Sequence, residues 1–248
     1  MIRFKLYQEM MEEYIANKRS GSFPLHSYFA FQSPETFYPG LDTRLLHDKS
    51  RFDWVSRLEA ECPHMVAELD DLLQERVGFL PIYEKQTKQG KWAGCFFGFF
   101  GRRISEIYER CPKTAKLLDS IPGAIESGTS LFSALAPNTR VAPHCGNTNF
   151  KLRCQLPLRV PDGCGFKLAD QDVKVTEGEC FIFDDSFLHT VWNLSDKPRF
   201  ALIFDIYHPD LTTAEIDALA RLTLESDPHK YYFDLINSGH TADWVYEH

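Results

Sequence analysis

The chain has 248 residues and a mass of 28.6 kDa, enough for one domain with a sizeable core. Hydrophobic residues make up 44% and charged residues 25%, ordinary values for a globular protein. The formal charge of −8 argues against a basic surface for nucleic acid. The longest apolar run, 92–101, is half of the roughly 20 residues that a membrane helix needs. We therefore expect neither nucleic acid nor membrane as a partner.

The seven cysteines indicate the compartment. Their number is odd, the N-terminus has no signal-peptide apolar region, and no two cysteines form a C-x-x-C pair. These features argue against a disulfide framework and against a structural zinc knot. The sequence therefore favours a reducing, cytoplasmic location.

Residues 1–125 are predicted to be a helix-rich support. Apolar residues recur at helical spacing between Trp54 and Leu73, and Pro63 predicts a kink or the first turn of a fresh helix. Gly78 is the expected stop of this helix.

Three further segments of this support carry local signals. Residues 95–100 are typical of a buried strand, and a second helix is expected to start at Pro112. Segment 20–40 is rich in aromatic residues, so we expect an ordered loop packed on the core.

Residues 126–210 change character and are predicted to form a jelly-roll core. Short runs separated by Gly, Asn, Asp and Pro are typical of an antiparallel sandwich or barrel. Segment 150–158 alternates apolar and polar residues, and segments 179–184 and 199–207 predict further strands. Residues 211–248 are expected to form a C-terminal helix, opened by a capping box at 212–215, and an irregular tail. The whole chain is predicted to be a single, mainly β domain with flanking helices.

Two histidines and an arginine concentrate the chemistry. His144 precedes Cys145-Gly146, His189 ends the run F-D-D-S-F-L-H, and Arg199 follows ten residues later. Two neutral imidazoles and a guanidinium that can hold a carboxylate are the parts of a non-haem iron site with a keto-acid cosubstrate. The carboxylate ligand that usually lies two residues after the first His is replaced by Gly146. From the residues alone, either water takes that position or the site is of another kind, and each side chain taken singly would be ordinary.

The combination is specific. The segments SALAPNTRVAPHCGNTNFKLR, EGECFIFDDSFLHTVWN and RFALIFDIYHPDLT closely resemble the aspartyl/asparaginyl β-hydroxylase family of iron- and 2-oxoglutarate-dependent oxygenases. The resemblance covers most of the chain and is weakest over the first 25 and the last 35 residues. It implies a double-stranded β-helix (jelly roll, cupin-like) oxygenase fold and a single catalytic domain.

The resemblance also implies the cofactors and the metal ligands. His144 and His189 match the iron ligands, and Gly146 matches a family pattern that lacks the carboxylate ligand. The expected cofactors are Fe(II), 2-oxoglutarate as cosubstrate, and O2. The implied reaction hydroxylates an unactivated C–H and yields succinate and CO2.

The residues that would bind 2-oxoglutarate follow from the same resemblance. Arg199 matches the partner of the distal carboxylate, and Ser133 matches a hydroxyl that assists there. Arg153 matches a contact at the other end of the cosubstrate, and Gln155 is a further candidate for cofactor binding. Polar Lys151, Arg153 and Gln155 should then face into the barrel, while their apolar neighbours pack against helices.

The substrate side departs from the family pattern. Gln155, Leu131 and Lys151 stand where a vertebrate member has His, Lys and Arg, which reduces the positive charge. We therefore expect a small-molecule or peptide substrate of amino-acid type, oxidised at the β-carbon of an aspartyl, asparaginyl or related unit. Candidate substrate contacts are Lys151, Asn149 and Arg103.

Two other classes of function stay open. One is a cupin-type metalloenzyme that uses no keto acid, and Arg199 and Ser133 weigh against it. The other is a non-catalytic jelly-roll binding module, against which the intact His144, His189 and Arg199 argue.

Overall fold

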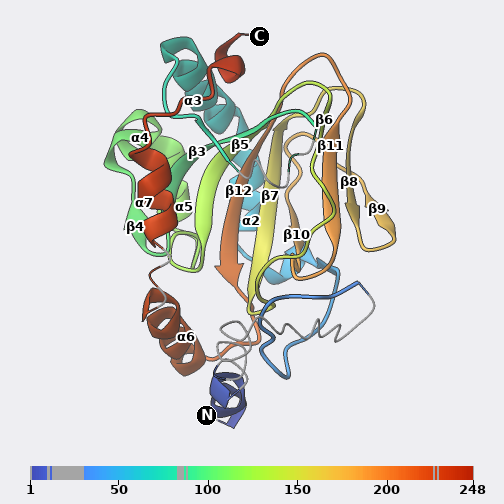
Figure 1. The fold of residues 1–248 in the computed structure, drawn as a ribbon, viewed down its shortest axis with the longest axis vertical. Coiled ribbons are helices and arrows are strands. Elements are labelled where there is room, and N and C mark those ends of the chain that lie inside the picture. The colour runs from blue at the N-terminus through green and yellow to red at the C-terminus, as the bar shows by residue number, and fades with distance from the viewer. Residues whose placement is uncertain are drawn as a thin grey trace.

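The computed structural model describes residues 2–9, 12, 31–82, 87, 89–225, 227 and 229–247. Two antiparallel sheets form its centre (Figure 1). The large sheet has the strand order β1-β10-β7-β12-β5-β3-β2, with β4 paired to β3, and the small sheet has the order β6-β11-β8-β9. The predicted jelly roll with flanking helices is confirmed.

The strands are β1 (Leu46–His47), β2 (Leu80–Pro81), β3 (Trp92–Phe99), β4 (Arg102–Arg103), β5 (Thr129–Leu135), β6 (Thr139–Arg140), β7 (Lys151–Arg159), β8 (Cys164–Leu168), β9 (Gln171–Val173), β10 (Phe181–Phe183), β11 (His189–Asn193) and β12 (Arg199–Tyr207). After residue 31, the α-helices are α2 (Val55–Ala60), α3 (Cys62–Glu75), α4 (Ser105–Arg110), α5 (Pro112–Asp119), α6 (Thr213–Glu225) and α7 (His229–Ile236).

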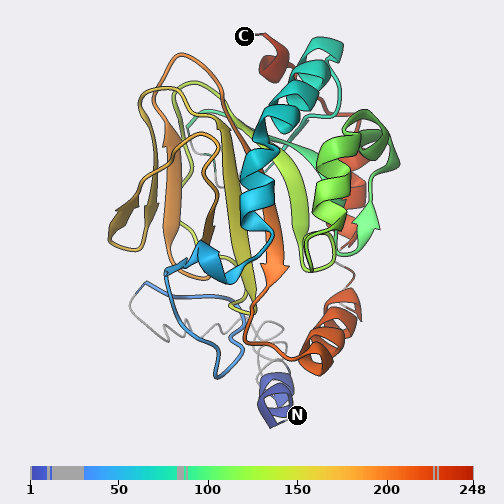
Figure 2. The same cartoon turned by 180° about the vertical axis from the view of Figure 1, so that it is seen from behind.

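The two faces of the large sheet differ in chemistry. Its outer face packs under α2, α3, α4 and α5 (Figure 2), where Leu152 and Cys154 of β7 are fully buried in one apolar cluster. Arg153 and Gln155 of the same strand point to the other face and line cavities between the sheets. The predicted inversion, with polar residues inside and apolar residues against helices, is confirmed.

The helices begin largely as predicted. The interruption at Pro63 separates α2 from α3, and Pro63 lies in the first turn of α3. Helix α3 ends at Glu75 because Arg76 takes a left-handed conformation, so the predicted stop at Gly78 comes too late. Helix α5 starts at Pro112 as expected, whereas α4 was not predicted. No helix in the described ranges is both long enough and apolar enough to cross a bilayer.

Strands from before residue 125 join the same large sheet as the later ones. The predicted buried strand is part of β3, which pairs with β5 along most of its length. The helix-rich support therefore also supplies strands to the jelly roll. Of the predicted ordered loop at 20–40, residues 20–30 lie outside the described residues, and Gln32 and Tyr38 of the remainder are buried.

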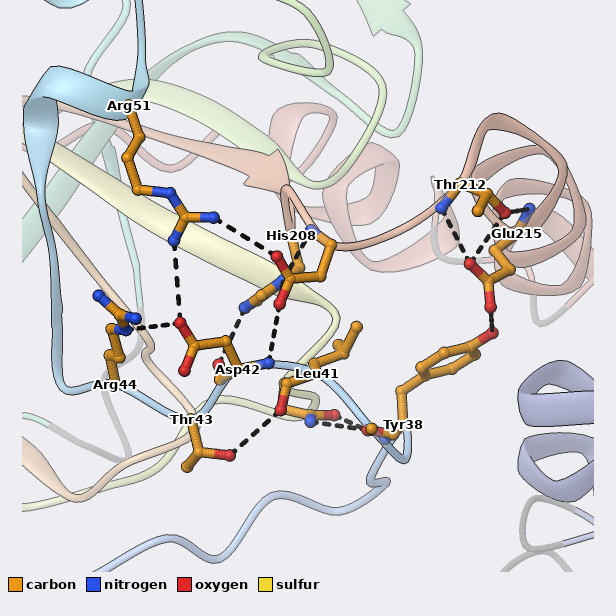
Figure 3. A network of polar contacts seen from close by, with 12 residues as sticks. Tyr38, Leu41, Asp42, Thr43, Arg44, Arg51, His208, Thr212 and Glu215 are labelled. Atoms are coloured by element: carbon orange, nitrogen blue, oxygen red, sulfur yellow. Dashed lines mark hydrogen bonds and ion pairs between the residues drawn. The ribbon is translucent and has the colours of Figure 1, made fainter.

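The capping box at the start of α6 is confirmed and anchors the C-terminal segment. The Glu215 carboxylate accepts hydrogen bonds from the backbone N and Oγ1 of Thr212, both at 2.9 Å (Figure 3). It also accepts one from the Tyr38 hydroxyl at 2.8 Å and pairs with Arg3. The chain continues into α7, which replaces part of the predicted irregular tail.

A second polar network holds the end of β12. Arg51 lies between the carboxylates of Asp42 and Asp210, at 3.8 and 3.4 Å (Figure 3). His208 follows β12, and its Nε2 lies 3.1 Å from the Asp42 carbonyl oxygen, to which it donates. These contacts tie segment 42–51 to the end of the strand that begins at Arg199.

We expect the Glu215 anchor to make stability depend on acidity. Burial raises the pKa of Glu215, but the hydrogen bonds from Thr212, Arg3 and Tyr38 outweigh it and lower the pKa from 4.5 to about 2. Because the pKa is lower in the folded state, the contribution is complete above pH 4.5 and is lost as pH falls towards 2. Urea unfolding between pH 6 and 3 should show a smaller loss of stability for Glu215→Gln than for the wild type. Glu225→Gln, at an exposed position of the same helix, should behave as wild type; parallel curves for all three proteins would contradict the prediction.

Candidate active site

The two predicted metal-binding histidines meet across a backbone bridge. His144 N donates to His189 O at 3.0 Å, His189 N donates to His144 O at 2.8 Å, and the ring centroids are 4.2 Å apart. Each Nδ1 lies near a backbone carbonyl, that of Ala142 at 2.9 Å and that of Phe187 at 2.8 Å. Because a carbonyl only accepts, each Nδ1 carries the hydrogen and each Nε2 keeps a lone pair.

The protonation state suits metal binding. Burial lowers the pKa of His144, and burial together with the neighbouring His144 lowers the pKa of His189 well below its usual value. Both rings are therefore neutral at physiological pH, as metal ligation requires. Among the described residues, no three His, Cys, Asp or Glu side chains are placed to hold a metal together.

Arg199 lines a narrow inner chamber of about 20 Å³ together with His144 and His189. The residue is only 3% exposed, and burial lowers the pKa of its guanidinium to about 10. Its Nη2 donates to Gln155 Oε1 at 3.2 Å, whereas its Nε has no hydrogen-bond partner among the described atoms. No carboxylate of the described residues forms an ion pair with it, so a buried cation faces the chamber without a counter-charge.

Ser133 lies beside Arg199 on the neighbouring strand. In the register of β5 and β12, Ser133 is opposite Ala201, two residues along from Arg199 on the same face. The Ser133 Oγ accepts a hydrogen bond from the Trp92 indole at 2.8 Å and lines the inner chamber. The predicted group of Arg199, Ser133 and Gln155 is thus brought together with the two histidines.

Arg153 lines both the inner chamber and a wider outer chamber of about 390 Å³. It lies directly opposite Asp205 in the register of β7 and β12, with Nε 2.9 Å from Oδ1. Its Nη1 is 3.3 Å from the Asp185 carboxylate, and Lys151 lies 3.7 Å from Asp205. Burial raises the pKa of Asp205, but Arg153 and Lys151 lower it to about 2, so this carboxyl is ionised.

Gly146 leaves the space that Asp185 uses. A Cβ built on Gly146 would overlap the Asp185 carboxylate, whereas the Gly146 N–H donates to the Asp185 backbone carbonyl. A side chain at the position of the usual carboxylate ligand would therefore displace Asp185 from its contact with Arg153.

Two of the predicted substrate contacts are not brought to the chambers. Asn149 accepts from Tyr38 N at 2.6 Å and donates to Tyr38 O at 2.9 Å, so its amide holds segment 31–40. Arg103 is exposed on β4 and pairs with Asp119 and Glu126. Lys151, the third candidate, does line the outer chamber.

Sequence reasoning missed several lining residues. Asp205 is six positions after Arg199 on the same strand. Because an even spacing places two side chains on the same face of a strand, the sequence could have predicted that Asp205 lies in the site. Asp185 was part of a recognised motif but was not assigned to the site. Tyr231 and Tyr232 reach the outer chamber from α7, for which the sequence carried no recognised signal.

Known proteins provide an independent comparison. A family model described as Aspartyl/Asparaginyl beta-hydroxylase matches residues 59–209. The chain is 33% identical over 207 residues to Aspartate beta-hydroxylase domain-containing protein 2 of Mus musculus, covering 79% of this chain and 60% of that protein. It is 37% identical over 137 residues to Aspartyl/asparaginyl beta-hydroxylase of Homo sapiens, covering 54% of this chain and 18% of that protein.

The chain spans 60% of the length of the first relative, and the segment that the family model matches includes His144, His189 and Arg199. The family model matches well over half of the chain, and the resemblance seen in the motifs is confirmed. The chain belongs to the aspartyl/asparaginyl beta-hydroxylase family.

Proposed function

We propose that the protein is an Fe(II)- and 2-oxoglutarate-dependent dioxygenase that hydroxylates an unactivated C–H of an amino-acid-type substrate. The observation that carries the proposal is the buried Arg199, a cation with no counter-charge among the described residues, in one chamber with two neutral histidines. A dianionic keto acid that reaches Arg199 would supply this counter-charge.

His144 and His189 would hold the iron through their Nε2 atoms, because the Nδ1 atoms are committed to backbone carbonyls. Bound iron supplies the activation of O2, and the protein supplies placement and exclusion of water. With two neutral protein ligands, the two negative charges of 2-oxoglutarate would offset two of the three positive charges of Fe(II) and Arg199.

Arg199 would hold the distal carboxylate of 2-oxoglutarate. A guanidinium offers a planar fork of donors that matches a carboxylate. The Arg199 Nε, which has no hydrogen-bond partner in the described part of the chain, supports this role. The Ser133 hydroxyl, which lines the same chamber from the adjacent strand, would add a hydrogen bond to the same carboxylate. Arg153 is already paired with Asp205, so its guanidinium would contact Asp205 and the cosubstrate at the same time.

We extend the proposal to the compartment. All seven cysteines are free thiols in the structure, which supports a reducing, cytoplasmic environment that also provides Fe(II).

The direct test is formation of succinate. We expect the protein to bind one Fe(II) and to convert 2-oxoglutarate to succinate with O2, and we expect EDTA to stop the conversion. His144→Ala should abolish iron binding, whereas His64→Ala, at a half-exposed position on α3, should not. Iron binding without succinate would favour a metalloenzyme that uses no keto acid, and no iron binding would favour a binding module.

Arg199→Gln should raise the KM for 2-oxoglutarate at least about tenfold, because loss of one partner of a buried charge pair costs about 2 kcal/mol or more. Arg199→Lys keeps the charge but loses the fork, so its KM should lie between those of the wild type and Arg199→Gln. Steady-state kinetics would measure both, with the exposed Arg140→Gln as the control. An unchanged KM in Arg199→Gln would remove this residue from cosubstrate binding.

Gly146→Asp should fail to create a better metal site, because the new side chain would overlap the Asp185 carboxylate. Overpacking of this kind costs about 1–3 kcal/mol. We expect Gly146→Ala to lower the free energy of unfolding by a similar amount, and by less in an Asp185→Ala background. A double-mutant cycle by urea unfolding measures this coupling. Additive costs of the two substitutions would show that Asp185 does not restrict position 146.

A further inference from the structure

We propose that helix α7 selects the substrate, and that the substrate is an α-amino acid, free or within a peptide, with an apolar side chain. Tyr231 and Tyr232 of α7 line the outer chamber. This inference rests on the proposed function and names the substrate class of the same site.

Helix α7 is held firmly against the large sheet. Tyr232 stacks on Phe99 with ring centroids 4.8 Å apart and meets Phe96 at 5.5 Å. The Nε2 of His229 lies 3.1 Å from the Phe100 carbonyl oxygen, and the Arg102 guanidinium lies 4.2 Å from the Phe233 ring. Figure 1 shows α7 beside β3 and β4, away from the small sheet. The wall that α7 provides is therefore positioned by packing.

The rings of the outer chamber form an aromatic surface. Trp92 and Phe100 line it together with Tyr231 and Tyr232. Tyr231 is 51% exposed, which places its ring where the chamber meets solvent. Aromatic side chains in this number offer a large apolar contact area to a ligand.

The charged residues of the outer chamber cancel one another. Lys151 and Arg153 lie within ion-pair distance of Asp205, and Arg153 also lies near Asp185. Among the described lining residues, the two cations are matched in number by two acidic residues, so they present no excess of basic groups to an acidic side chain. An acidic substrate would add a net negative charge beside two carboxylates, whereas an ammonium and a carboxylate on one molecule, or a neutral peptide unit, would add none.

The position of α7 in the chain bears on specificity. The family model ends at residue 209, and α7 lies at His229–Ile236, beyond that match. The metal and cosubstrate residues lie within the matched segment. Tyr231 and Tyr232 of α7 thus add to the outer chamber a surface that lies beyond the matched segment.

The experiment compares L-phenylalanine, L-leucine, L-aspartate and N-acetyl-L-phenylalanine amide. Each is tested for stimulation of succinate formation by the Fe(II)-loaded enzyme and, separately, for binding by calorimetry. We expect kcat/KM for L-phenylalanine or its amide to exceed that for L-aspartate at least about tenfold. Activity or binding of the free form alone identifies a free amino acid, and preference for the amide identifies a peptide.

Variants then test the wall. Tyr231→Ala should raise the KM and the dissociation constant for the preferred phenylalanine compound about fivefold, because an aromatic contact is lost. The KM for 2-oxoglutarate should not change. Tyr231→Phe should restore wild-type values, and Leu224→Ala, an exposed apolar position on α6, should behave as wild type.

Preference for L-aspartate, binding of none of the four compounds, or unchanged constants in Tyr231→Ala would overturn the inference. Failure of the proposed function looks different: no succinate forms with any compound, while calorimetry still reports binding that Tyr231→Ala weakens. In that case the role of α7 in substrate binding is kept, and the proposed reaction is wrong.

Discussion

The site depends on charged side chains buried on the inner face of the large sheet. A buried charge is tolerated only when it is paired, because its desolvation is costly. Arg153 meets this condition within the protein, since the antiparallel register of β7 and β12 places Asp205 directly opposite it. Among the described residues, the Arg199 guanidinium has only the neutral Gln155 amide as a hydrogen-bond partner. Arg153 is thus paired within the protein, whereas Arg199 has no counter-charge among the described residues.

Apolar burial on the opposite face of the same strands offsets the cost of burying these charges. Leu152, Cys154 and their counterparts on β12 are buried under four helices in one continuous apolar cluster. Because successive side chains of a strand alternate between faces, the register that buries these residues also points Arg153 and Asp205 inward. A slip of one residue would exchange the two faces and destroy both the core and the site.

Segments distant in sequence complete the chambers. Asp185 lies over Gly146 and contacts Arg153, which couples the turn before His189 to the turn after His144. Glu215 fixes the start of α6 to Tyr38, and the chain then leads to α7 on the sheet. His144, His189 and Arg199 come from the jelly roll, whereas the wall of the outer chamber comes partly from helix α7.

The sequence by itself determined the local features: the alternation of β7, the break at Pro63, the capping box of α6, and the motifs that contain His144 and His189. These follow from periodicity and short spacing, which are properties of neighbouring residues. Only the tertiary structure decided which charges are neutralised, that Asn149 binds the Tyr38 backbone, that Arg103 lies on the surface, and that α7 lines the outer chamber. The physical reason is distance along the chain. Arg153 and Asp205 are 52 residues apart, and no local pattern specifies a contact that the pairing of two strands creates.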